Sequence, residues 1–473
     1  MKLMRIAMLA LAGLMIVPLA AAQEKGPPLP KNLPPYGPLV PFRAPQVVQK
    51  RLANGLTLWM VPRPGFPKVS FAVAVRGGMA SDPKNRPGLS KLLLDTIDQG
   101  TKTKSARQIA EAFQADGGDL TGAPHADFAP MDISVLASRV ASTLGTLSDV
   151  LENAAFPDGE VALAKRNEAD SLRASEADPS FLAGRALARE MFGGHPYSVT
   201  ALTEASIAAT TPDELRQVYA QRFRPDQTIL VAVGDFDTDA MTAEVQRAFG
   251  HWASPAPAPA VGVTPPAENN SRGVFLVPRK GSVQTAFVLG AFGPLESSPD
   301  FAAAQVANAV YGGMFGSRLV NDIREDKGYT YSPGAYIRER NVAGVLETRA
   351  SVRNAVTGAS LNEIFYQLNR MATTSPTPEE LTRAKRYLTG IRAIEYQLQA
   401  AVAQRLASLW VEGLPPEEIG EESAKIQKVT VDEVDQAGRK YFPASRQTIV
   451  AVGEQSAVET QLAPFGLPIH VVE

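Results

Sequence analysis

Cysteine is absent from the 473-residue sequence, which excludes disulfides and thiol chemistry. Histidine occurs only four times, and no two copies lie three or four residues apart: His125, His195, His251 and His470. Because a helical zinc motif needs two histidines at such a spacing, no local motif of that kind exists here. The positive and negative charges also nearly balance. The formal net charge is −2, which argues against nucleic acid or a strongly anionic surface as a partner.

Long apolar runs are missing except at the N-terminus. The run Ile6–Ala20 follows Lys2 and Arg5 and ends at the small residues Ala20–Ala22. It is shorter than the ~20 residues of a spanning helix, and its flanks are those of a signal peptide. We expect residues 1–22 to be removed during secretion across the inner membrane. The mature chain would then have no membrane anchor and would lie in the periplasm.

Two proline-rich segments divide the remaining chain. Residues 23–45 form an extended lead-in without a core of its own, and residues 254–271 have the Pro/Ala composition of a semi-rigid linker. The segments between and after them predict two separately packed halves, residues 46–253 and residues 272–468.

The two halves repeat each other at a nearly constant offset. Val61-Pro62-Arg63 recurs as Val277-Pro278-Arg279, and the apolar run after Gln227-Thr228 recurs after Gln447-Thr448. Each half opens with alternating, β-branched segments, continues with helices and closes with another strand. This order predicts α+β halves, each a mostly antiparallel sheet covered on one face by helices.

Residues 88–101 carry a characteristic frame of five positions: Gly88, Leu89, Leu93, Gly100 and Thr101. This frame resembles the zinc helix of the M16 peptidases, the pitrilysin-like inverzincins. In that family two histidines one turn apart bind zinc, and a glutamate beside them is the general base. The three corresponding positions here are Lys91, Leu94 and Asp95.

The third zinc ligand of the family is a glutamate on a later helix. Counting back from Asp178-Pro179 places that position at Ser171. A catalytic zinc needs three protein ligands and an open position for water, which these four side chains do not provide. The resemblance therefore implies a peptidase fold with no zinc of its own that cleaves nothing alone. The simplest role for Lys91 and Asp95 is an i,i+4 ion pair worth ~0.2–0.5 kcal/mol.

The second half keeps a different part of the family's active site. Residues 319–332 contain Arg324 and Tyr331, and Gly312-Gly313 and Ser317-Arg318-Leu319 precede them. This run resembles the family motif whose arginine and tyrosine reach the substrate. The resemblance implies that Arg324 and Tyr331 donate hydrogen bonds near the carbonyl that is cleaved, where an oxyanion develops. The alternative is that both are ordinary surface and packing residues.

The resemblance as a whole implies two halves that close like a clamshell around an unfolded peptide, which adds as a strand to a sheet edge. We expect a non-catalytic, substrate-binding subunit of a heterodimeric M16 zinc peptidase. The partner would be a homologue with an intact H-x-x-E-H helix, and the zinc would belong to that partner. Two alternatives remain. One is a peptide-binding or scaffold protein with no catalytic contribution. The other is an independent enzyme with different chemistry, which would need a clustered nucleophile and base, and the sequence offers no such motif.

Overall fold

The computed structural model describes residue 37, residues 44–254, residues 262–267 and residues 273–472. The predicted signal peptide lies outside the described residues, as do most of the lead-in and most of the linker. Residues Phe42–Glu473 form one compact unit, to which the description below refers. Within the described part of the chain, no helix has both the length and the apolar character that crossing a bilayer requires.

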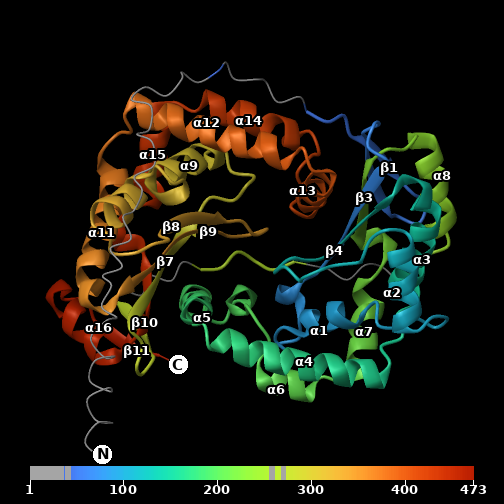
Figure 1. The fold of residues 1–473 in the computed structure, drawn as a ribbon, viewed down its shortest axis with the longest axis horizontal. Coiled ribbons are helices and arrows are strands. Elements are labelled where there is room, and N and C mark those ends of the chain that lie inside the picture. Colours follow the sequence, from blue (N-terminus) through green and yellow to red (C-terminus); the bar gives the residue numbers. More distant parts are fainter. Residues whose placement is uncertain (1–36, 38–43, 255–261, 268–272, 473) are drawn as a thin grey trace, which may run out of the picture. The chain divides into compact units, whose positions relative to one another are not determined.

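The first half builds a five-stranded sheet with the strand order β1-β2-β5-β3-β4 (Figure 1). Its strands are β1 (Val48–Arg51), β2 (Thr57–Pro62), β3 (Lys68–Arg76), β4 (Phe128–Leu136) and β5 (Thr228–Gly234). The pair β2–β5 is parallel, and the other three pairs are antiparallel. β5 comes from the end of the half and inserts between β2 and β3.

The second half builds a six-stranded sheet with the order β11-β6-β10-β7-β9-β8. Its strands are β6 (Val274–Pro278), β7 (Gln284–Gly293), β8 (Gly334–Arg338), β9 (Gly344–Arg353), β10 (Thr448–Gly453) and β11 (Ile469–Val471). β10 inserts between β6 and β7, as β5 does between β2 and β3. The repeated Val-Pro motif ends β2 in one half and β6 in the other. The predicted pair of homologous α+β halves with mostly antiparallel sheets is confirmed.

Helices of the same half cover one face of each sheet. In the first half they are α1 (Leu89–Thr96), α2 (Ala106–Ala115), α3 (Val140–Asn153), α4 (Asp158–Glu176), α6 (Glu204–Ala209), α7 (Pro212–Arg222) and α8 (Thr238–Phe249). In the second half they are α9 (Phe301–Asn308), α11 (Thr357–Thr373), α12 (Pro378–Glu395), α14 (Glu418–Lys428), α15 (Val431–Tyr441) and α16 (Gln455–Leu462). Each set forms a separate apolar core with its own sheet.

The opposite face of each sheet is covered by a helix from the other half. α5 (Pro179–Phe192) packs on β7 and β10, and α13 (Gln399–Val411) packs on β3 and β5 (Figure 1). These contacts form two further apolar cores, which contain Leu187 of α5 and Leu406 of α13. The sequence predicts helices on one face and separately packed halves. The structure differs on both points. Each sheet is covered on both faces, and the helix on its second face comes from the other half.

Polar contacts reinforce this exchange. Arg63 donates through Nη2 to the carbonyl oxygen of Tyr396 at 2.9 Å, and Arg76 donates through Nη2 to that of Trp410 at 3.0 Å. The Arg76 guanidinium also lies 4.0 Å from the centre of the Trp410 ring. Both arginines belong to the first half, so they fix the two ends of the exchanged α13.

Candidate functional site

The start of α1 is fixed by a buried ion pair that the sequence alone does not reveal. Asp82 Oδ1 accepts hydrogen bonds from Arg222 Nη1 at 3.0 Å and from Ser90 Oγ at 2.6 Å. Asp82 Oδ2 accepts from the backbone N–H of Ser90 at 3.0 Å. Burial raises the pKa of Asp82, although Arg222 and Ser90 oppose the shift. This network holds the first turn of α1 against α7.

Two of the α1 positions that correspond to the family's zinc helix, Lys91 and Asp95, belong to a cluster of charged side chains. Lys91 Nζ lies 2.5 Å from both carboxylate oxygens of Asp95 and 3.3 Å from Glu168 Oε2 on α4. Burial disfavours the ammonium, but Asp95 and then Glu168 raise the pKa of Lys91 overall. The lysine therefore stays charged and forms ion pairs with both carboxylates. The predicted i,i+4 pair is present, with a second carboxylate added.

The other two positions that correspond to the family's zinc site, Leu94 and Ser171, lie apart from this cluster. The side chain of Leu94 is buried in the core of the first half. Ser171 lies exposed on α4, about one turn beyond Glu168. Because residues three apart on a helix share a face, Glu168 could have been found by looking one turn before Ser171 for a carboxylate.

The residues that meet here do not fit a zinc ion. Lys91 places an ammonium between the two carboxylates, where it would repel a divalent cation. Zinc in a catalytic site takes imidazole, thiolate and carboxylate ligands and keeps one open position. Among the described residues, no group of three or more histidine, aspartate or glutamate side chains is arranged to hold a metal.

The segment that carries Arg324 is held by buried ion pairs. Arg318, on the short helix α10 (Arg318–Val320), donates from Nε and Nη2 to the two carboxylate oxygens of Glu380, each at 2.8 Å. A π-helical segment, Asn321–Asp326, follows and contains Arg324. Lys327 then pairs with Asp322 at 2.6 Å, which ties the end of this segment back to its start. A π-helical turn inside a helix is frequent at functional sites.

Arg324 and Tyr331 lie together, as the resemblance implies, and Phe315 completes the group. The centre of the Arg324 guanidinium lies 4.6 Å from the Tyr331 ring and 4.5 Å from the Phe315 ring. Tyr331 is 80% exposed and Phe315 is 62% exposed. Two rings on the guanidinium leave its edge, which carries the N–H groups, for hydrogen bonding. Nε of that edge lies 3.1 Å from Glu325 Oε1.

These side chains border a shallow depression of about 430 Å³ formed entirely by second-half residues. Its floor includes Gln284 of β7 and Ser351 and Arg353 of β9. The edge strand β8 begins three residues after Tyr331. Within the described residues β8 pairs only with β9. β4, an edge strand of the first sheet, is different, because the backbone of Asp132 exchanges two hydrogen bonds with Thr121.

Comparison with known families gives two matches. Residues 61–204 match the model described as Insulinase (Peptidase family M16), and residues 209–388 match the model described as Peptidase M16 inactive domain. The two matches together cover more than half of the chain and include α1, Arg324 and Tyr331.

Individual proteins that are similar to this chain agree with the two family matches. A protein of Bacillus subtilis (strain 168) named uncharacterized zinc protease YmxG is 27% identical over 62% of this chain and 70% of its own length. A Helicobacter pylori protein named non-peptidase homolog YmxG is 25% identical over 77% of this chain and 84% of its own length. The crystal structure of a peptidase M16 inactive domain from Pseudomonas fluorescens superposes with a TM-score of 0.80 at 24% identity, over 86% of this chain and 98% of that one.

Proposed function

Since this chain belongs to peptidase family M16, we propose that it is the non-catalytic, substrate-binding subunit of a secreted heterodimeric peptidase. Its partner is an M16 homologue that carries the H-x-x-E-H helix and holds the zinc. Arg324 and Tyr331 act in trans, donating hydrogen bonds to the carbonyl of an unfolded peptide in the partner's site. The N-terminal segment 1–22 is the reason to place this complex in the periplasm.

The stack of Phe315, Arg324 and Tyr331 carries the proposal. Donors held in position stabilise a developing oxyanion better than mobile ones, because they need not reorganise during the reaction. Arg324 is held between two rings, and the Tyr331 hydroxyl forms no hydrogen bond with a described residue. The depression beside them contains no first-half residue, which suits a site completed by a second protein.

The edge of β8 supports a peptide as the substrate. An extended peptide can add a strand to a sheet edge through backbone hydrogen bonds. β8 begins at Gly334, directly after the segment that contains Tyr331. A peptide added there would lie beside the Arg324 and Tyr331 donors.

A scaffold protein without a catalytic contribution is the second candidate. The ion cluster of Lys91, Asp95 and Glu168 and the relative named a non-peptidase homolog fit this candidate equally well. A scaffold has no use for the exposed hydroxyl of Tyr331, so that atom separates the two candidates.

The test is the Tyr331→Phe variant in a complex reconstituted with a secreted H-x-x-E-H homologue from the same organism. This change keeps the ring against Arg324 and removes one donor. We expect kcat/KM for peptide hydrolysis to fall roughly 10²–10³-fold, the cost of one oxyanion donor. Tyr366→Phe on α11, where Tyr366 is 56% exposed, is the matched control and should leave kcat/KM unchanged. Wild-type turnover in a fully assembled Tyr331→Phe complex would establish the scaffold instead.

A further inference from the structure

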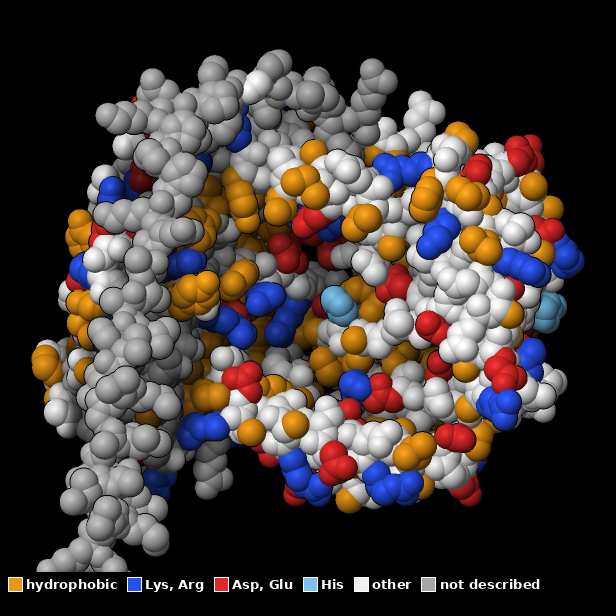
Figure 2. Space-filling view, viewed as in Figure 1, with side chains coloured by type: hydrophobic (Ala, Val, Ile, Leu, Met, Phe, Trp, Pro, Cys, Tyr) orange, Lys and Arg blue, Asp and Glu red, His pale blue; other side chains and the backbone are white. Residues whose placement is uncertain are grey.

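A cavity of about 690 Å³ lies between the two halves, away from Arg324 and Tyr331. The first half contributes α5 and residues 125–128, and the second contributes α13 and the β8–β9 hairpin. Its volume falls in the range of ~300–1,000 Å³ that is usual for small-molecule sites. Figure 2 shows basic side chains gathered beside a hollow of this face, next to a histidine.

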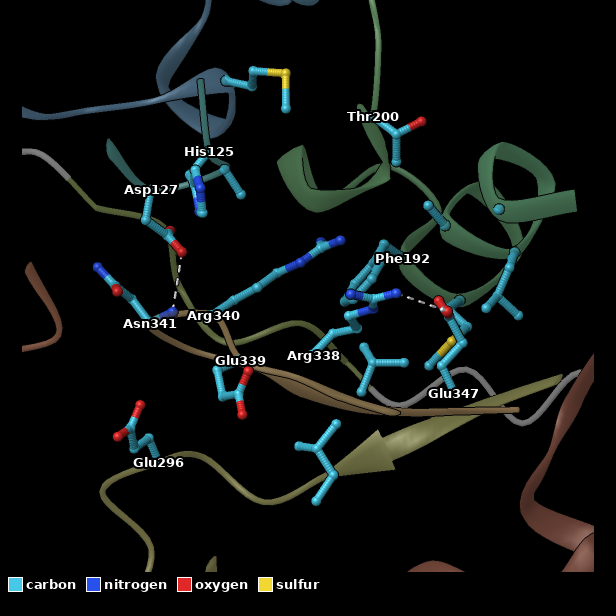
Figure 3. A pocket seen from close by; sticks show the side chains of 18 of the residues that line it. His125, Asp127, Phe192, Thr200, Glu296, Arg338, Glu339, Arg340, Asn341 and Glu347 are labelled. Atoms are coloured by element: carbon cyan, nitrogen blue, oxygen red, sulfur yellow. Dashed lines mark hydrogen bonds and ion pairs between the residues drawn. The ribbon is translucent and has the colours of Figure 1, made fainter. Parts of the chain in front are cut away.

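Two arginines of the hairpin share a single carboxylate in this cavity. Arg338 Nη2 lies 3.6 Å from Glu347 Oε1, and Arg349 Nε donates to the same oxygen (Figure 3). Glu347 is 8% exposed, whereas Arg338 is 52% exposed. One carboxylate between two guanidinium groups leaves one positive charge uncompensated. The remaining N–H groups of Arg338 are accessible to a ligand.

Arg340 adds another positive charge, which Asp127 offsets in part. Its guanidinium lies 4.8 Å from the Phe192 ring and 4.7 Å from the Tyr197 ring, and Nη1 donates to the Tyr197 carbonyl oxygen at 2.9 Å. Arg340 forms no ion pair with a described residue, and burial lowers its pKa. The nearby Asp127 already accepts from the Tyr197 hydroxyl at 2.6 Å and from the Asn341 N–H at 3.0 Å. Because Arg338, Arg340 and Arg349 outnumber Glu347 and Asp127, this end of the cavity carries a net positive charge and favours an anion.

The other walls of the cavity restrict the class of anion. Phe181, Phe301 and Ile337 supply apolar surface, which suits an anion attached to an apolar body rather than a small inorganic ion. Glu296 and Glu412 line the cavity as well. The ionised carboxylate of Glu296 favours a ligand that also carries N–H donors, as a peptide does and a fatty acid does not.

We propose that this cavity binds short peptides through a free C-terminal carboxylate, which lies on Arg338 and Arg349. A guanidinium pair matches a carboxylate through several charge-assisted hydrogen bonds. The apolar walls receive the last side chain, and the carboxylate of Glu296 faces the N–H groups of the peptide. The site belongs to this chain alone and does not require Arg324, Tyr331 or a partner subunit.

Isothermal titration of the purified chain, without a partner, tests the site. The probe is the tetrapeptide Ala-Ala-Ala-Phe with a free C-terminus, and its C-terminal amide and octanoate are the comparison ligands. We expect the free acid to bind at least 10-fold more tightly than the amide, and more tightly than octanoate. Equal affinity for acid and amide, or no binding of the acid at millimolar concentration, would refute the carboxylate site. Binding of octanoate without the peptide would refute the peptide assignment.

Variants locate the binding within the molecule. Arg338→Gln should weaken binding of the free acid at least 10-fold, and Arg338→Lys should recover part of the loss because it keeps the charge. Arg107→Gln on α2, where the arginine is 86% exposed, is the control and should bind like the wild type. Equal melting temperatures show that each variant is folded. Unchanged affinity in a folded Arg338→Gln would place the binding elsewhere and overturn the proposal.

Discussion

Glu412 should make the stability of this protein fall as the pH rises. Its Oε1 accepts a hydrogen bond from Ser408 at 2.9 Å, while its buried Oε2 finds no donor among the described residues. Glu296 faces it, and Arg405 binds Glu296. Burial, and then the neighbouring Glu296, raise the pKa of Glu412 to about 9. Glu412 therefore keeps its proton at neutral pH.

The sign of the effect follows from proton binding. Between its ordinary pKa of 4.5 and about 9, Glu412 is protonated in the folded chain and ionised in the unfolded chain. The folded state then binds more protons, so the free energy of unfolding falls by up to about 1.4 kcal/mol per pH unit from this group. Arg405 outweighs burial and lowers the pKa of Glu296, so Glu296 acts only below this window.

Glu412→Gln removes the titration and keeps an N–H donor for Glu296. We expect the variant to gain up to about 4 kcal/mol relative to the wild type between pH 5.5 and 8.5, measured by chemical denaturation. Subtracting the wild-type free energy of unfolding from that of the variant at each pH removes the contribution of all other titrating groups. Glu111→Gln on α2, whose carboxylate is 56% exposed and paired with Arg107, should follow the wild-type curve. Parallel curves for the wild type and Glu412→Gln would refute the raised pKa of Glu412.

Two further predictions concern the zinc positions and the linker. The purified chain should contain far less than one zinc per molecule in metal analysis, because the Lys91 ammonium lies between Asp95 and Glu168 and would repel a divalent cation. About one zinc per molecule, with chelator-sensitive hydrolysis, would contradict this. A specific protease site placed at residues 255–261 should be cut without separating the halves, which should elute together in size-exclusion chromatography because α5 and α13 are exchanged. Leu406→Ala in the cut protein should weaken that association by ~2–5 kcal/mol, the cost of a large-to-small change in a core. Separate elution of the two fragments of the cut wild type would contradict the exchange.

The sheet architecture could be predicted because its information is local and repeated. Val61-Pro62 and Val277-Pro278 end equivalent strands, and the runs that begin at Thr228 and Thr448 form equivalent central strands. All seven residues of β5 are buried, which is typical of a strand covered on both faces.

The helix exchange could not be predicted from the sequence. The apolar faces of α5 and α13 show that each helix packs on something, but they do not identify the sheet. Leu187 and Leu406 would suit the core of either half equally well. Similarly, the pairing of Lys91 with Glu168 depends on how α4 lies against α1, which no sequence spacing fixes. Phe315 was missed because a lone phenylalanine in a glycine-rich turn has no periodicity.

The residues of α1 and the pair Arg324 and Tyr331 differ in how far packing and stability explain them. On α1, Leu92 and Leu93 face the core, whereas Lys91 and Asp95 lie on the other side and meet Glu168. Zinc ligands can therefore be replaced by an ion cluster there without disturbing the packing. Arg318 and Glu380 explain why the segment around Arg324 is folded. They do not explain Tyr331, because a ring that is 80% exposed buries little apolar surface and adds little to stability. The proposed function assigns that ring a contact with a molecule outside this chain, which is why Tyr331 is the residue on which the proposed function is tested.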